Sequence, residues 1–150
     1  MTSGAWIAVG AVALALALGL WRLGTDGRFR GTHPVRRTSA QEPASRGERT
    51  AAELVAALGE PLGGRATLLQ FSSAFCAPCR ATRRVLGDVA DLVEGVTHVE
   101  VDAEHHLEAT RALGILRTPT TVVLDAAGAE VTRATGAPTR DQVLSALART

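Results

Sequence analysis

A pair of cysteines in the middle of the chain constrains the fold more than any other feature. Cys76 and Cys79 are the only cysteines among 150 residues, and two residues separate them in the stretch FSSAFCAPCRATRR. The apolar segment 67–72 before them predicts a short buried strand. Pro78 predicts the first turn of a helix, because its missing N–H costs nothing there. The pair therefore stands where a strand ends and a helix begins.

Further helices and strands alternate along the rest of the chain. Helical spacing and capping residues predict the helices, and apolar or alternating segments predict the strands. The predicted helices cover 51–58, 78–92, 107–113 and 139–148, and the predicted strands cover 67–72, 97–102, 120–125 and 130–135. This order predicts an α/β domain in which a mixed central sheet carries helices on both faces.

The position of the two cysteines favours redox chemistry. A CxxC pair that closes a strand and opens a helix is typical of a redox motif. The positive end of the helix and its unpaired N–H groups favour the thiolate of Cys76. Cys79 lies one turn further in and is predicted to be more buried. We therefore expect Cys76 to attack a disulfide and Cys79 to resolve the mixed disulfide.

The motif FCAPCRA, followed by the Thr-Pro pair of RTPTTVVLD, resembles the thioredoxin family and its membrane-anchored bacterial members. The resemblance implies a thioredoxin fold over residues 49–150 and a thiol–disulfide oxidoreductase with no cofactor beyond the Cys76–Cys79 dithiol. It also implies a cis peptide bond before Pro119 and a substrate strand that pairs with the backbone of Thr118. Gly136 matches a family glycine that lets a substrate approach closely.

Several residues depart from the family pattern. Phe75 and Ser72 stand where thioredoxins carry tryptophan, and Gln70 stands where they carry a buried aspartate that serves the resolving cysteine. His98 matches a family lysine on the next strand. An amide cannot take up a proton, so we expect His98, or a water held by Gln70, to assist Cys79. The alternative is that both are hydrogen-bonded interior groups without a part in the chemistry.

Two other kinds of site are weighed against the dithiol. His105 and His106 together with the two cysteines would supply four zinc ligands, but these histidines start a helix elsewhere in the predicted fold. We therefore expect no metal site. The net charge of +1 and the lack of a Gly-rich phosphate loop or an aromatic-interleaved basic patch argue against nucleotides and nucleic acids.

The N-terminal residues form an apolar run. Residues 2–21 contain no charged side chain, and in a helix they rise about 30 Å, the thickness of a bilayer core. Trp6 and Trp21 lie near its two ends, where indole rings favour the headgroup region. No basic residue precedes the run, which argues against a cleaved signal peptide. We predict a transmembrane anchor over 1–23 that contacts lipid through 2–21.

The segment after the anchor predicts both a linker and a sidedness. Residues 24–48 are rich in Gly, Pro, Ser, Thr and Arg and predict a flexible basic linker. An excess of arginine marks the cytoplasmic flank of a membrane span, so we expect a single-pass protein with its domain in the cytoplasm. These arginines either rest on anionic lipid or are simply solvated.

Together these patterns predict a monomeric, membrane-tethered oxidoreductase that reduces disulfides in proteins. Two alternatives stay open. The first places the same chemistry outside the cytoplasm, in the maturation of cytochromes and other haem proteins. The second is a non-catalytic docking module with a thioredoxin fold, although a pure scaffold needs neither the CxxC pair nor the Thr-Pro pair.

Overall fold

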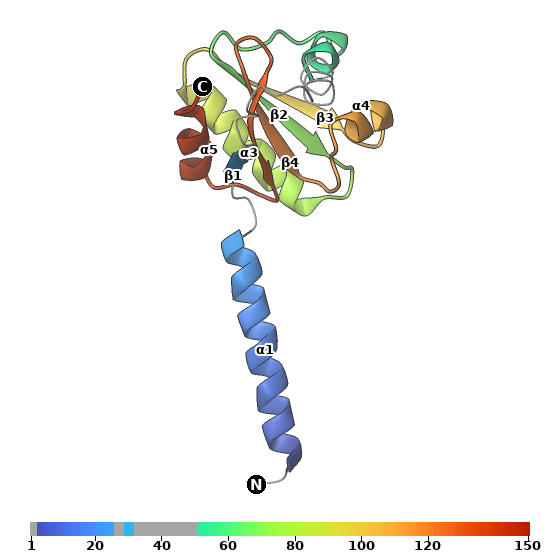
Figure 1. Cartoon of the computed structure of the whole chain (residues 1–150), viewed down its shortest axis with the longest axis vertical. Coiled ribbons are helices and arrows are strands. Elements are labelled where there is room, and N and C mark those ends of the chain that lie inside the picture. The colour runs from blue at the N-terminus through green and yellow to red at the C-terminus, as the bar shows by residue number, and fades with distance from the viewer. Residues whose placement is uncertain (1–2, 26–28, 32–50) are drawn as a thin grey trace, which may run out of the picture.

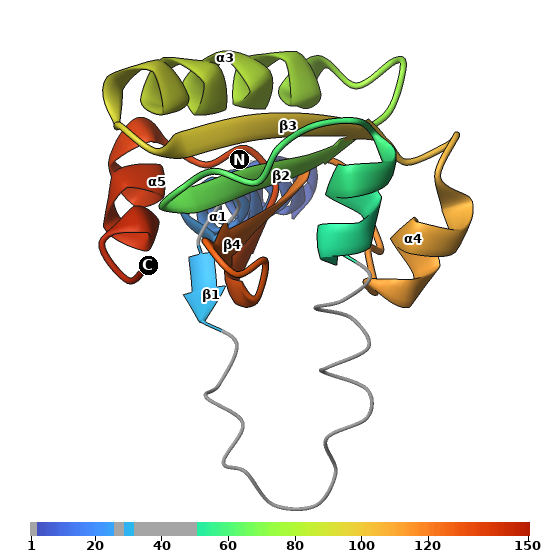
Figure 2. The same ribbon diagram turned by 90° about the horizontal axis from the view of Figure 1, so that it is seen from above.

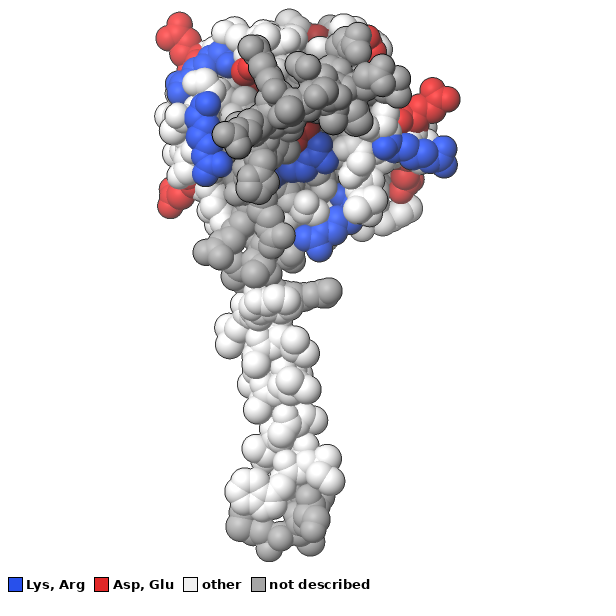
Figure 3. Space-filling model, viewed as in Figure 1, with Lys and Arg blue, Asp and Glu red and all other residues white. Residues whose placement is uncertain are grey.

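A computed structural model describes residues 3–25, 29–31 and 51–150 of the chain. The long helix α1 (Ser3–Thr25) projects away from an α/β domain (Figure 1). Large apolar side chains along α1, such as Leu14 and Leu16, are exposed, and its described surface carries no charged group (Figure 3). In this described part of the chain, no helix is both long and apolar enough to cross a bilayer. The predicted transmembrane helix is therefore not confirmed.

A five-stranded mixed sheet forms the centre of the domain. Its strands are β1 (Phe29–Gly31), β2 (Ala66–Ser72), β3 (Val96–Asp102), β4 (Thr120–Asp125) and β5 (Glu130–Thr135). They lie in the order β1-β5-β4-β2-β3, with β2 parallel to β3 and the other neighbours antiparallel. The four strands predicted from the sequence and the mixed character of the sheet are confirmed.

The structure differs from the predicted linker at β1. Phe29 pairs with Ala134 and Gly31 pairs with Thr132, so these residues extend the sheet beyond β5. A three-residue strand with one large apolar side chain carries no periodicity from which it can be predicted. Its pairing depends on the edge of β5, which lies far away in the sequence. The remainder of the predicted linker after Gly31, and the residues up to 50, lie outside the described residues.

The predicted helices of the domain are also found. Residues 51–57 are helical, and α3 (Ala77–Leu92), α4 (Leu107–Ala112) and α5 (Arg140–Leu147) follow. Thr139 caps α5. Its hydroxyl oxygen accepts the N–H of Gln142, and the Gln142 side-chain oxygen accepts the N–H of Thr139 at 2.8 Å. These two bonds satisfy N–H groups that have no partner within the helix.

Two apolar clusters lie on opposite faces of the sheet (Figure 2). Leu69 and Phe71 of β2 pack toward the helix over 51–57, whereas Leu68 of the same strand packs toward α3 and α5. Successive side chains of a strand point to opposite faces, and β2 therefore contributes to both clusters. Its seven residues are all buried, and it positions the helices that carry the functional residues.

The cluster beneath α3 provides a test of the fold. Leu86 is fully buried there, whereas Leu92 on the same helix is 59% exposed. We expect Leu86→Ala to lower the free energy of unfolding by about 2–5 kcal/mol, because it leaves a cavity in a packed core. The matched control Leu92→Ala should change it by less than about 0.5 kcal/mol. Urea unfolding measures both, and equal losses would contradict the packing described.

Candidate active site

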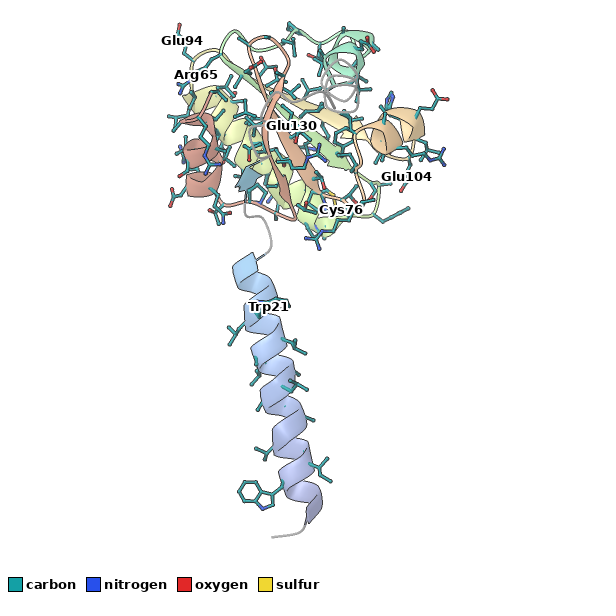
Figure 4. All side chains as sticks on the ribbon, viewed as in Figure 1. Trp21, Arg65, Cys76, Glu94, Glu104 and Glu130 are labelled. Atoms are coloured by element: carbon teal, nitrogen blue, oxygen red, sulfur yellow. A yellow bond between two sulfur atoms is a disulfide. The ribbon has the colours of Figure 1, made fainter. Side chains whose placement is uncertain are left out.

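Cys76 and Cys79 lie at the start of α3, at one rim of the domain (Figure 4). Their sulfur atoms form a disulfide of 2.05 Å. Cys76 is the N-cap residue of the helix, and its Sγ accepts the backbone N–H of Cys79 at 3.1 Å. Cys76 is half-buried, whereas Cys79 is only 2% exposed. The predicted difference in burial is confirmed, and Cys76 is the sulfur that a partner can reach.

The loop around Pro119 lies beside the cysteine loop. The Thr118–Pro119 bond is cis, as predicted. The hydroxyl groups of Ser73 and Thr118 are hydrogen-bonded at 3.0 Å, which joins the segment before Cys76 to the proline loop. The N–H of Gly136 donates to the carbonyl oxygen of Pro119 at 2.8 Å. The structure therefore brings Thr118, Pro119 and Gly136 together beside the segment that precedes Cys76.

Gly136 adopts a backbone conformation with positive φ, which glycine tolerates best. Its φ is +92°, in the region that residues with a side chain rarely adopt. Ser73 was not predicted as a site residue from the sequence, although it lies three residues before Cys76. A lone serine in a loop carries no signal of its own, and its role depends on a partner 45 residues away.

Gln70 is fully buried beneath the start of α3. Its Nε2 donates to the hydroxyl of Ser72 at 2.7 Å and to the carbonyl oxygen of Cys79 at 3.0 Å. A backbone carbonyl only accepts, and this contact therefore fixes the orientation of the amide. The Gln70 Oε1 then faces His98 Nε2 at 3.1 Å, and that nitrogen of His98 must carry a hydrogen. Gln70 thus links His98 to the backbone of Cys79, and not to its sulfur.

The imidazole of His98 is held toward its neutral form. Burial lowers the pKa of His98, the charge of Glu100 opposes this effect, and the charge of Arg83 adds to it. The net pKa lies below the ordinary value. A neutral imidazole with hydrogen on Nε2 keeps a lone pair on Nδ1. His98 can therefore accept a proton there.

Glu100 is a charged group at this site that the sequence analysis missed. Arg83 binds its carboxylate through two contacts, of 2.5 Å from Nε and 2.8 Å from a terminal nitrogen. Burial raises the pKa of Glu100, but hydrogen bonds from Arg83 and Ser72 outweigh this effect and leave the pKa below its usual value. The carboxylate is therefore ionised at neutral pH. Ser72 connects it to Gln70.

The pairing of β2 with β3 explains how these polar groups come together. Leu68 lies opposite His98, Gln70 opposite Glu100, and Ser72 opposite Asp102. The alternation along β3 places His98, Glu100 and Asp102 on one face. This alternation was the signal in the sequence that could have identified Glu100. The sheet face that carries these residues is apolar at one end and polar at the end beneath the cysteines.

A cleft of about 400 Å³ opens at this polar end of the face. Both cysteines line it, together with Ser72, Glu100, Arg80 and Arg83. Ser72 and Glu100 come from the sheet, and the two arginines come from α3. Of the three arginines in the stretch 80–84, Arg84 does not line the cleft.

No three His, Cys, Asp or Glu side chains converge on a possible metal site in the described ranges. Asp102 instead contacts the Nδ1 of His105 at 2.8 Å and accepts the N–H of Glu104. The hydrogen bond from the N–H of Glu104 has the largest effect and that of His105 the next, and both lower the pKa of Asp102. Asp102 thus caps the turn after β3.

A family model for a thioredoxin-like domain matches residues 59–150. The chain belongs to the thioredoxin-like domain family. Among solved structures, Fasciola hepatica thioredoxin has a TM-score of 0.53 and 25% identity, covering 65% of this chain and 88% of that one. Spinach chloroplast thioredoxin f has a TM-score of 0.51 and 25% identity, covering 57% and 76%. A comparison with curated protein sequences gives no match.

A more distant likeness shows the fold alone. A mutant thioredoxin from Halobacterium salinarum has a TM-score of 0.52 at 20% identity, covering 56% of this chain and 73% of that one. This thioredoxin-like domain carries the disulfide at the start of α3 and the cis-proline loop beside it. The arrangement supports thiol–disulfide redox activity in general.

The burial of His98 predicts how stability depends on pH. Because the pKa of His98 in the folded chain lies below its ordinary value of 6.5, the unfolded chain binds more protons between the two values. Stability therefore falls as the pH falls through about 6.5. Between pH 8 and pH 5.5 we expect His98 to account for a loss of at most about 1.4 kcal/mol.

Urea unfolding of the oxidised chain at the two pH values measures this effect. His98→Gln should reduce the loss, and the control His106→Gln should retain it. An unchanged loss in His98→Gln would show that other groups cause it.

Proposed function

We propose that this protein reduces disulfide bonds in other proteins. The observation that carries the proposal is the Cys76–Cys79 pair at the start of α3, joined to the cis-proline loop by the contact between Ser73 and Thr118. The two cysteines lie at the start of a helix and next to the loop with the cis bond before Pro119. This arrangement is suited to thiol–disulfide exchange. We further propose that the protein works as a monomer and needs no cofactor beyond this dithiol.

The proposed reaction starts from the reduced protein. The Cys76 thiolate attacks one sulfur of the substrate disulfide, and the other substrate sulfur leaves as a thiolate that takes up a proton. Cys79 then loses its proton and attacks Cys76 Sγ, which releases the second substrate thiol. The two electrons of the dithiol thus reduce one substrate disulfide. The N–H of Cys79 and the N-terminus of the 16-residue helix favour negative charge on Cys76 Sγ.

Thr118, Pro119 and Gly136 are proposed to bind the substrate chain. Their clustering beside the cysteine loop supports this role. The backbone of Thr118 pairs with an extended substrate segment, and Gly136 leaves room for that segment because it has no side chain. Recognition through the backbone accepts many sequences.

Proton transfer at Cys79 is proposed to use His98 or a water held by Gln70. Gln70 cannot take up the proton itself. The lowered pKa of His98 leaves its imidazole neutral and able to accept one. The direct contact of Gln70 with the Cys79 carbonyl supports a second contribution, which is to hold the backbone of Cys79 in place.

Attachment to a membrane is a separate proposal. It rests on the uncharged sequence of residues 2–21 and on the exposed apolar side chains of α1. We propose that these side chains contact lipid and that the domain lies in the cytoplasm, on the side favoured by the arginines that follow α1.

The roles of the two cysteines predict different outcomes for their variants. In insulin reduction with dithiothreitol, we expect Cys76→Ser to abolish turnover, because it removes the attacking sulfur. Cys79→Ser should also lose turnover. Once reduced and freed of dithiothreitol, this variant should form mixed disulfides with insulin through Cys76, which a non-reducing gel resolves. The double variant is the control and should trap nothing. Turnover that persists in Cys76→Ser would refute the proposed function.

Lipid contact predicts a shift between cell fractions. We expect the wild-type chain in the membrane fraction and Leu14→Arg/Leu16→Arg in the supernatant, because arginine within a bilayer costs about 2.5–3.5 kcal/mol. The control Leu92→Arg/Leu116→Arg changes two exposed leucines of the domain and should stay with the membrane. A wild-type chain in the supernatant would contradict lipid contact.

A membrane-impermeant thiol reagent that labels the domain in intact cells would contradict the cytoplasmic side.

A further inference from the structure

We propose that the cleft beside the disulfide binds small disulfides that carry a carboxylate, with Arg80 as the residue that contacts the carboxylate. The inference rests on the proposed function of the same cysteines and names a second class of substrate for them.

The space exists because the side chains at the ends of β2 and β3 are either small or already paired. Ser72 closes β2 with a short side chain, which Gln70 and Glu100 hold by hydrogen bonds. At this position the thioredoxin resemblance calls for a tryptophan, whose indole would occupy the space. The resulting hollow of about 400 Å³ lies in the range of small-molecule sites.

Arg80 is the unpaired cation at this hollow. Arg83 and Glu100 neutralise each other through their two contacts, and Asp102 already accepts the N–H of Glu104 and contacts His105. Arg80 is exposed and has no hydrogen-bond or ion-pair partner for its guanidinium in the described part of the chain. A guanidinium binds a carboxylate with two parallel hydrogen bonds. The guanidinium of Arg80 is therefore free to bind the carboxylate of a ligand in the cleft.

The position of Arg80 places this anion close to the reacting sulfurs. Arg80 lies one residue after Cys79, and its N–H donates to the carbonyl oxygen of Cys76 at 3.4 Å. Both cysteines line the same hollow. A carboxylate a few bonds from a disulfide can therefore contact Arg80 while that disulfide meets Cys76. The extended chain of a protein substrate is proposed to bind elsewhere, along Thr118.

The reaction in the cleft balances without a further reactant. The Cys76 thiolate attacks one sulfur of the small disulfide and releases one thiolate, which takes a proton from water. Cys79 gives its proton to solvent and attacks Cys76 Sγ, which releases the second thiolate. One protein dithiol is oxidised to the Cys76–Cys79 disulfide, and one small disulfide is reduced to two thiols.

Single-turnover oxidation of the full chain tests the proposal. The protein, in a non-ionic detergent, is reduced, freed of reductant and mixed with one of three small disulfides. These are the dianion 3,3′-dithiodipropionate, the neutral bis(2-hydroxyethyl) disulfide and the dication cystamine. Acid quenching, alkylation and mass spectrometry follow the loss of the two thiols. The readout is the rate constant of each charged disulfide divided by that of the neutral one, which cancels any general change in the reactivity of Cys76.

We expect Arg80→Gln to lower the ratio for the dianion by about threefold at low salt, the size of an exposed ion pair. The same substitution should raise the ratio for the dication. Molar salt should remove most of the wild-type preference. Arg84→Gln is the matched control, because it removes an arginine of the same helix that does not line the cleft, and it should leave both ratios unchanged.

Three outcomes would overturn the inference. The first is an unchanged dianion ratio in Arg80→Gln, and the second is an equal fall in Arg84→Gln, which would show a general effect of helix charge. The third requires the same measurement with a disulfide within an acidic peptide: a fall confined to that peptide would make the partner a protein segment. Failure of the proposed function is distinguishable, because the reduced chain would then oxidise with none of the three disulfides and would not reduce insulin.

Discussion

The burial of β2 is the constraint on which the rest of the domain depends. All seven of its residues are buried, and it pairs with β3 on one side and β4 on the other. Its side chains alternate between the two apolar clusters, which fixes the register of the sheet, because a slip of one residue would exchange the two faces. The end of β2 leads into the loop that carries Cys76. The placement of the disulfide is thus a consequence of how the central strand is packed.

The buried amide of Gln70 shapes the chemistry beneath the disulfide. A carboxylate in this place would need compensation for its charge in an apolar setting, whereas the amide is satisfied by Ser72, His98 and the Cys79 carbonyl. The charge lies one strand further out, on Glu100, where Arg83 neutralises it. The interior below Cys79 is therefore polar but uncharged, and the ionised groups border the cleft instead.

The sequence was sufficient for most of the fold because its signals are local. The apolar segments, Pro78 and the cap at Thr139 each act within a few residues, and the structure confirms the elements they predicted. The paired motifs that carry the family resemblance also located the cis bond before Pro119. The contacts of Ser73 and Glu100 could not be predicted in the same way. They require the register of β2 against β3 and the position of α3, which are set by packing across the whole domain.

The strand β1 also fixes how far the domain can lie from α1. Only residues 26–28 separate the end of the helix from the first residue paired with β5. Thr25 and Phe29 are four residues apart in sequence, so their Cα atoms can be separated by at most about 14 Å. The longer stretch after Gly31 therefore adds nothing to this reach, because both of its ends belong to the domain. The domain therefore stays within a short distance of the end of α1, wherever that helix lies.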